Sequence, residues 1–242
     1  LSDNSVTMAI YVLAAMLAHK EVLLLNVHLK PNEIENQLKQ LGVTTVLHSQ
    51  DRRNQLPDSM CVIEFEPLET ILADRVLEDI FDWTFNDTDI AAIMNTSATT
   101  GQFQEVLGKT EQDNWLMVLP LFHVSGLSIL MRSLYNGTAI TILPKYDEIK
   151  VLELIESEKI NMMSLVPTIL TQLEPKITHH TLRVILLGGE FIPMALIDAC
   201  EKKSLPIYKT YGMTETFSQS VTFSVLDYPH KRDSVGRPLP GM

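Results

Sequence analysis

The sequence predicts an α/β fold of mostly parallel sheets flanked by helices. Short apolar segments such as Val184–Leu187 alternate along the chain with longer amphipathic segments such as Glu148–Glu158. A continuous apolar segment is typical of a parallel strand that is covered on both faces, and the amphipathic spacing is typical of a helix. Helices that alternate with strands connect them as βαβ units, so most neighbouring strands should run in the same direction.

The first part of the chain shows this alternation in order. Met8–His19 is predicted to form a helix, and Val22–Leu25 is predicted to form a short buried strand. The next helix should have Pro31 in its first turn and end at Gly42, because proline suits the start of a helix and glycine suits its end. Val43–Leu47 is then expected to be a further strand.

Polar residues fill the segment Gln50–Pro57, which we expect to be a surface loop. The alternation then continues toward the C-terminus. The expected strands are Ala91–Met94, Leu116–Leu119, Ala139–Leu143, Met162–Val166, Val184–Leu187 and Pro206–Lys209. The expected helices are Leu127–Tyr135, Glu148–Glu158 and Met194–Lys202. Ligands of an open α/β sheet bind beyond the carboxyl ends of the strands, so a site is expected in the loops that follow the strands.

The composition excludes some classes of function. The 242 residues include 19 Lys and Arg against 30 Asp and Glu, a net charge of −11, and nonspecific nucleic-acid binding requires the opposite balance. The longest apolar run, Met8–Ala18, is well short of the ~20 residues that a membrane span requires. Cys61 and Cys200 lie far apart with no CxxC spacing, so we expect buried thiols in a reducing compartment.

The first candidate site is Thr96–Gly101, the sequence TSATTG, directly after the expected strand Ala91–Met94. Its hydroxyl and backbone N–H groups could surround phosphate oxygens without adding charge. An ordinary Ser/Thr-rich turn is the alternative, and the position after a buried strand favours phosphate. Gly108 and Lys109 resemble the end of a Walker phosphate loop, but Phe103 stands where that loop requires glycine, so we reject this second interpretation.

The second candidate site is the sequence Gly188-Gly189-Glu190, at the end of a predicted strand. Two glycines let a flat aromatic ring lie on bare backbone, and the backbone N–H and C=O groups can bind the edge of a base. The alternative is a tight turn between strand and helix that needs glycine only for its dihedral angles.

The third candidate site is the sequence YGMTET, residues 211–216, after the expected strand Pro206–Lys209. Tyr211 could stack on a base, the hydroxyl of Thr214 could reach a phosphate, and the carboxylate of Glu215 could hold Mg²⁺. A capped turn with a surface glutamate would have the same composition. The density of different donors in this short segment favours the ligand-binding interpretation.

The sequences TSATTG, GGE and YGMTET, in this order after predicted strands, resemble the adenylate-forming acyl-CoA synthetase superfamily. Within it, the chain is most similar to the 2-succinylbenzoate–CoA ligases of menaquinone (vitamin K2) biosynthesis. That narrower resemblance rests on Leu119–Ser128, on the continuation of the third motif to Ser218 and Gln219, and on Ser234–Gly241. The similarity covers nearly the whole chain, and it implies the large N-terminal domain of an adenylate-forming ligase.

The resemblance implies roles for the site residues. The ATP phosphates would be bound by Thr96, Ser97, Thr99, Thr100 and Gly101. The rest of the nucleotide would be bound by Gly188, Gly189, Glu190, Tyr211, Gly212, Met213 and Thr214. The acyl substrate would be bound by His123, Ser125, Gly126, Ser218 and Gln219. Thr214, Glu215 and His123 would be catalytic, with Glu215 as the Mg²⁺ ligand, although a single histidine after an apolar strand is more often structural.

The implied reaction has two steps and uses ATP, Mg²⁺ and CoA. A substrate carboxylate attacks the α-phosphorus of ATP to give acyl-AMP and pyrophosphate, and the CoA thiol then displaces AMP to give a thioester. The resemblance also implies a cytoplasmic enzyme with small-molecule partners, and it leaves the oligomeric state open, a homo-oligomer included. Another aryl or acyl-CoA synthetase and a noncatalytic nucleotide-binding module are the alternatives.

The chain departs from the superfamily pattern in three places. Ala98 replaces a glycine of the phosphate loop, and the segment Gln102–Asn114 is short for the helix that the family has there, with no counterpart of the loop lysine. The chain ends at Met242, before the ribose-binding aspartate, the hinge and the small domain that carries the adenylation lysine. We therefore expect residues 1–242 to be an incomplete N-terminal adenylate-forming domain without the small C-terminal domain.

Overall fold

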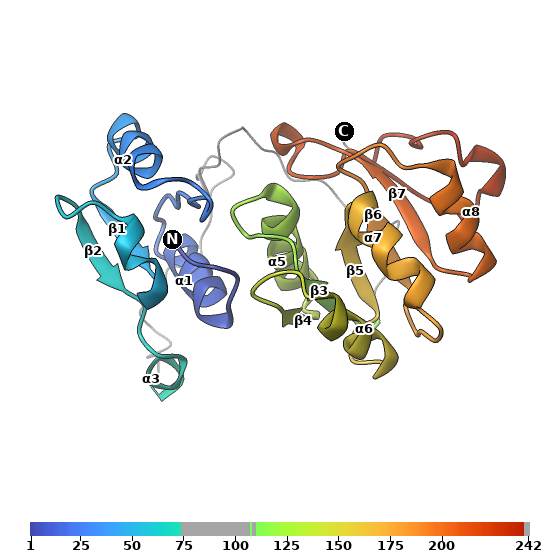
Figure 1. Cartoon of the computed structure of the whole chain (residues 1–242), viewed down its shortest axis with the longest axis horizontal. Coiled ribbons are helices and arrows are strands. Elements are labelled where there is room, and N and C mark those ends of the chain that lie inside the picture. Colours follow the sequence, from blue (N-terminus) through green and yellow to red (C-terminus); the bar gives the residue numbers. More distant parts are fainter. Residues whose placement is uncertain (74–106, 108–109, 240–242) are drawn as a thin grey trace. The chain divides into compact units, whose positions relative to one another are not determined.

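The computed structural model describes residues 1–73, 107 and 110–239 (Figure 1). The chain divides into two compact units, Leu1–Asn95 and Thr96–Met242, which are described separately below. None of the helices in these described ranges is long and apolar enough to cross a membrane.

The first unit contains three helices and a parallel pair of strands among its described residues. Their bounds are α1 Val6–Leu17, α2 Pro31–Gln40, β1 Thr45–His48, β2 Cys61–Glu64 and α3 Leu68–Ala73. The helix α1 begins where the Ser5 hydroxyl accepts a hydrogen bond from the Met8 N–H at 3.0 Å. Pro31 opens α2, and Gly42 follows its end with a φ of +66°, which confirms both predicted boundaries.

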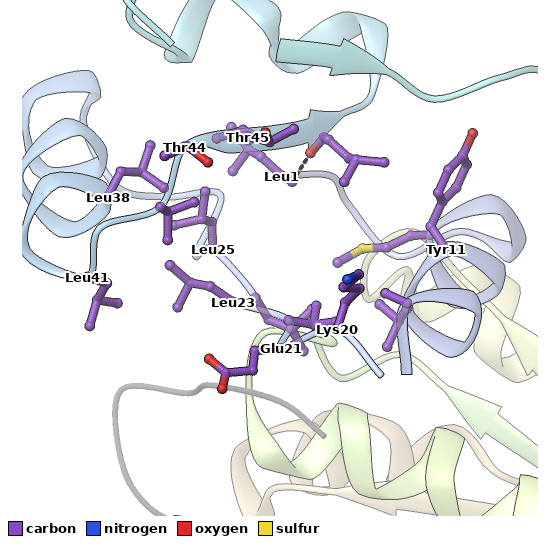
Figure 2. A pocket seen from close by; sticks show the side chains of 18 of the residues that line it. Leu1, Tyr11, Lys20, Glu21, Leu23, Leu25, Leu38, Leu41, Thr44 and Thr45 are labelled. Carbon is purple, nitrogen blue, oxygen red and sulfur yellow. Dashed lines mark hydrogen bonds between the residues drawn. The ribbon is translucent and has the colours of Figure 1, made fainter. Parts of the chain in front are cut away.

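The predicted strand Val22–Leu25 is wrong, since this segment contains only a bridge residue at Leu23. It lines an apolar pocket of about 540 Å³ inside the first unit. Figure 2 shows Leu23 and Leu25 in this pocket together with Leu38 and Leu41 from the region of α2. Burial against these side chains accounts for the apolar run, and burial alone does not require a strand to pair with a neighbour.

Two further expectations for the first unit need correction. Gln50–Pro57 is not a plain loop, because Gln50–Gln55 forms a 3₁₀ helix in which Arg52 binds the Asp3 carboxylate at 2.6 Å. Cys61 is exposed rather than buried, because β2 leaves most of its side chains in solvent. Cys200 is buried as expected, and burial raises the pKa of its thiol to about 12.

The second unit contains a six-stranded sheet in the order β4-β3-β5-β6-β7-β8, parallel except for the antiparallel pair β7 and β8. The strands are β3 Asn114–Met117, β4 Ala139–Ile142, β5 Met162–Leu165, β6 Val184–Leu187, β7 Ile207–Tyr211 and β8 Val221–Ser224. The helices are α5 Val124–Asn136, α6 Glu148–Glu156, α7 Pro167–Leu173 and α8 Met194–Lys202. The predicted α/β class with a mostly parallel sheet is confirmed. In the two units together, α3, α7, β2 and β8 are additions that the sequence pattern missed.

Helices cover both faces of this sheet. Residues of α6, α7 and α8 form one buried cluster with alternate strand residues such as Leu116, Ile185 and Ile207. The helix α5 lies on the opposite face, since Trp115 points away from Leu116 and contacts the guanidinium of Arg132 at 4.9 Å. The two faces therefore differ in chemistry, and the face toward α5 carries more polar side chains.

An ion pair between the buried carboxylate of Asp113 and the partly exposed guanidinium of Arg183 joins the residues that precede two of these strands. Arg183 directly precedes β6, and Asp113 directly precedes β3. The Arg183 guanidinium donates two hydrogen bonds to the Asp113 carboxylate, from Nε to Oδ1 at 2.6 Å and from Nη2 to Oδ2. The hydroxyl of Thr110 donates to Asp113 Oδ1 at 2.6 Å. Burial raises the pKa of Asp113, but the bonds from Arg183 and Thr110 outweigh it and hold that pKa at about 2. The pair fixes the amino ends of β3 and β6 relative to each other.

Replacing Asp113 with asparagine should destabilise the fold by about 2–4 kcal/mol at pH 7, because it leaves the charge of Arg183 without its carboxylate. The lowered pKa means that this contribution is complete above pH 4 and is lost as the pH falls from 3.8 toward about 2. Urea unfolding of the native polypeptide measures it. Asp58→Asn, which removes a fully exposed carboxylate that pairs with Arg53, is the control and should change nothing measurable. Equal effects of the two substitutions would contradict the assignment.

Candidate functional site

A pocket of about 270 Å³ lies in the second unit, where the loops after β5, β6 and β7 meet the start of α5. It is lined by Leu119, His123, Val124, Ser125, Ser164, Leu165, Val166, Leu186, Gly188, Gly189, Thr210, Gly212, Met213, Thr214, Ser218 and Gln219. Three of its strand residues, Ser164, Leu186 and Thr210, come from the face toward α5, because they alternate with the core residues of their strands. The second and third motifs therefore meet at one pocket, as the position after parallel strands predicts.

The loop after β6 passes very close to β7. A Cβ atom at Gly188 would lie 2.2 Å from the Oγ1 of Thr210, so no side chain fits at this position. The next residue, Gly189, has a φ of +82°, which favours glycine. The two glycines thus leave this part of the pocket wall without side chains, and the Gly188 N–H donates to the Leu165 carbonyl at 3.4 Å.

The loop after β7 folds back on itself. A Cβ atom at Gly212 would lie 1.3 Å from the carbonyl oxygen of Ser218, so the close approach requires glycine. Between them, Thr214–Thr216 forms one 3₁₀ turn, and Ser218 adopts a φ of +86°. Backbone strain of this kind in a non-glycine residue is common at ligand sites. The fold-back places the two ends of the motif, Gly212–Thr214 and Ser218, in the same pocket wall.

The start of α5 forms another part of the wall. His123 is the residue that caps this helix, and its ring lies 4.6 Å from that of Phe122. His123 and Ser125 line the pocket, whereas Gly126 is buried in the helix and lies outside the wall. Two of the three acyl-pocket residues predicted from this motif are therefore brought to the site.

Ser164 lines the pocket and was missed by the sequence analysis. Its side chain is buried in β5, and its Oγ atom has no hydrogen-bond partner among the described residues. Buried hydroxyls in folded proteins are almost always bonded, so this one is available to a ligand. The available signal was a single hydroxyl within the otherwise apolar sequence of Met162–Leu165.

A buried positive charge lies farther along the helix that caps the pocket. Arg132 of α5 donates to the Ser128 hydroxyl at 3.1 Å and contacts the Trp115 ring. Burial lowers the pKa of Arg132 to about 10, so the guanidinium stays charged at neutral pH. This cation was also missed, because an arginine on an amphipathic helix usually faces solvent.

Other predicted site residues lie outside the pocket wall. Glu190 is exposed and accepts a hydrogen bond from the Thr168 hydroxyl at 2.8 Å. Tyr211 ends β7 with half of its surface exposed, and Glu215 is exposed in the 3₁₀ turn. The phosphate-loop residues Thr96, Ser97, Thr99, Thr100 and Gly101 lie outside the described residues.

The donor set near the pocket suits a metal ion held mainly by substrate. No group of three or more His, Cys, Asp or Glu side chains able to hold a metal is found in the described ranges. Mg²⁺ typically takes one or two protein carboxylates and completes its shell with phosphates and water, so a site based on Glu215 fits that pattern.

The mostly parallel sheet and the pocket at the ends of its strands place the chain among α/β proteins that bind ligands at that position, and the chain belongs to the AMP-binding enzyme family, whose model matches residues 1–242. It is 49% identical over all of its length to a 2-succinylbenzoate–CoA ligase of Lactococcus lactis subsp. lactis (strain IL1403), of which it covers 56%.

Solved structures show the same similarity. One is o-succinylbenzoate CoA synthetase from Bacillus subtilis in complex with its acyl-adenylate intermediate, with 31% identity, a TM-score of 0.84, and coverage of 99% of this chain and 53% of that one. The same enzyme in complex with ATP and magnesium ion has 31% identity and a TM-score of 0.85, with coverage of 98% and 54%. The chain thus spans about half the length of the relatives it matches.

Replacing Gly212 with alanine should destabilise the fold by about 3 kcal/mol or more, because the new methyl group would overlap the Ser218 carbonyl. Urea unfolding measures the loss. Gly42→Ala is the control for the loss of a glycine without a steric overlap: no atom lies within 4 Å of the new methyl group, and the left-handed φ of +66° should cost only about 1 kcal/mol. A loss in Gly212→Ala no larger than that in Gly42→Ala would contradict the requirement for glycine at the close approach to Ser218.

Proposed function

We propose that the protein is an AMP-forming acid–thiol ligase that converts 2-succinylbenzoate to its CoA thioester through an acyl-AMP intermediate, in menaquinone biosynthesis. The observation that carries this function is the meeting of the loops after β6 and β7 with the start of α5 at one pocket. The similarity to relatives named for this activity supports the choice of substrate.

The pocket wall has two chemically different parts. The backbone of Gly188, Gly189 and Gly212 offers N–H and C=O groups at close range, which suits the base and sugar of a nucleotide. His123, Ser125 and Ser164 offer polar side chains that suit an acyl substrate with carboxylate and ketone oxygens. Adjacent binding of the two substrates brings the attacking carboxylate to the α-phosphorus, and such positioning supplies much of the rate enhancement.

The first step forms a bond between a carboxylate oxygen and the α-phosphorus and breaks the bond to pyrophosphate. Thr214 would donate a hydrogen bond to the α-phosphate, and Glu215 would hold the Mg²⁺ ion. When bound, that ion would neutralise part of the negative charge on the phosphates. In the second step the CoA sulfur attacks the acyl carbon and AMP leaves, with Tyr211 against the adenine.

The net charge of −11 requires local compensation for anionic substrates. Neutral hydroxyl and backbone donors line the pocket, and the phosphate loop predicted at Thr96–Gly101 would add more of them. The buried cation of Arg132 adds positive potential on the α5 side of the sheet. We therefore expect small molecules rather than nucleic acid as partners. The proposal also includes a cytoplasmic location and leaves a homo-oligomer open.

Assay of the complete native polypeptide with a panel of carboxylates tests the substrate. With ATP, Mg²⁺ and CoA present, pyrophosphate release should be fastest with 2-succinylbenzoate, because the pocket offers polar groups to its second carboxylate and ketone. Faster release with benzoate or a fatty acid would assign another acyl-CoA synthetase. ATP binding without acyl-AMP formation for any carboxylate would leave a noncatalytic nucleotide-binding protein.

Replacing Ser164 with alanine should raise the KM for the carboxylate by about 3- to 10-fold, because the ligand loses a hydrogen bond. Thermal stability should not fall, since the Oγ atom has no partner among the described residues. Steady-state kinetics and thermal unfolding measure the two effects. Ser133→Ala is the matched control, because its Oγ is also buried without a described partner but lies outside the pocket wall. A similar KM increase in both variants would contradict the role of Ser164.

A further inference from the structure

A side-chain hydrogen bond joins the glycine loop after β6 to the neighbouring helix. The Thr168 hydroxyl, in the first turn of α7, donates to Oε2 of Glu190 at 2.8 Å. Glu190 is the first residue with a side chain after Gly188 and Gly189. The bond therefore acts at the first point where a side chain can hold this loop.

The loop needs such a contact because glycine backbones have unusual conformational freedom. On the side toward β7, the close approach of Gly188 to Thr210 limits the movement of the loop. On the side toward α7, the nearest atom to a Cβ at Gly189 would be a methyl group of Val166, at an ordinary contact distance of 3.5 Å. Beyond Glu190, Phe191 is 85% exposed and provides little packing. At the start of the loop, the Gly188 N–H donates to the Leu165 carbonyl at 3.4 Å. Thr168 adds a shorter directional contact at the other end of the glycine pair, where packing is loose.

The same bond determines where the Glu190 carboxylate lies. Its oxygen is held by Thr168, and the residue is not part of the pocket wall. A carboxylate that entered the pocket would repel the phosphates and carboxylate of the substrates. Holding it on α7 therefore removes an unfavourable charge from the site as well as fixing the loop.

We propose that Thr168 is a positioning residue for nucleotide binding, which acts by holding Glu190 and thereby the backbone of Gly188 and Gly189 in the conformation that receives the adenine nucleotide. This role rests on the proposed function, because it assumes that the pocket binds ATP. Thr168 does not line the pocket, so its effect is transmitted through the loop.

Thr168→Val in the complete native polypeptide tests this role, since valine keeps the shape and removes the hydroxyl donor. The KM for ATP should rise about 3- to 10-fold with kcat and thermal stability retained, because only the placement of the loop changes. Thr168→Ser should restore the wild-type KM. Thr171→Val is the matched control, because that hydroxyl on the same helix donates only to the Pro167 carbonyl at 2.9 Å. It should leave the KM for ATP unchanged.

Hydrogen–deuterium exchange gives a second readout that does not depend on activity. Exchange of the amides in residues 187–191 should be faster in Thr168→Val than in wild type or in Thr171→Val. Glu190→Ala combined with Thr168→Val should raise the KM for ATP no more than either change alone, since both break the same bond.

An unchanged KM and unchanged exchange in Thr168→Val, with the wild-type protein active, would overturn the positioning role and leave the proposed function intact. Additive effects of the two substitutions would also overturn it. A wild-type polypeptide that binds no ATP would instead overturn the proposed function, and faster exchange in Thr168→Val would then still show that Thr168 holds the loop.

Discussion

The parallel direction of β3, β5, β6 and β7 is the constraint on which the site depends. Strands that start together and run the same way also end together, so their following loops meet at one edge. The ion pair between Asp113 and Arg183 fixes the starts of β3 and β6, at the edge opposite the pocket. The ion pair that stabilises the sheet and the pocket therefore lie at opposite ends of the same parallel strands. Within β5, side chains alternate between the two faces, so Ser164 points toward the pocket while Met163 belongs to the core.

Much of the second unit could be predicted from the sequence, because its strands are continuous apolar runs and its helices are amphipathic. β6 and α8 have the predicted bounds, Val184–Leu187 and Met194–Lys202. The strand β8 was missed although Val221–Ser224 alternates apolar and polar residues as a strand does, because four residues are too few to make that pattern stand out and the antiparallel pairing with β7 is visible only in the fold. The strand predicted at Val22–Leu25 does not form, because an apolar run indicates burial but does not specify that a neighbouring strand is present to pair with it.

The motifs predicted the loops of the site better than its individual contacts. Glycine spacing identified Gly188 and Gly212 because local geometry requires glycine there. Thr210 and Thr168 carry no such local signal, because their importance arises only when segments distant in sequence pack side by side, and the signal at Ser164 was only a single hydroxyl in an apolar strand. The predicted roles of Tyr211, Glu190 and Glu215 stay predictions, as do those of Thr96–Gly101.

The state of Cys200 has a consequence for any enzyme that makes an activated acyl group. Acyl-adenylates react with thiolates, and a thiolate of the protein itself would compete with the thiol of the second substrate. Burial keeps Cys200 protonated far above neutral pH and out of contact with solvent. The only other cysteine of the sequence, Cys61, belongs to the first unit. The sheet that forms the pocket thus carries no reactive thiol of its own within its described residues.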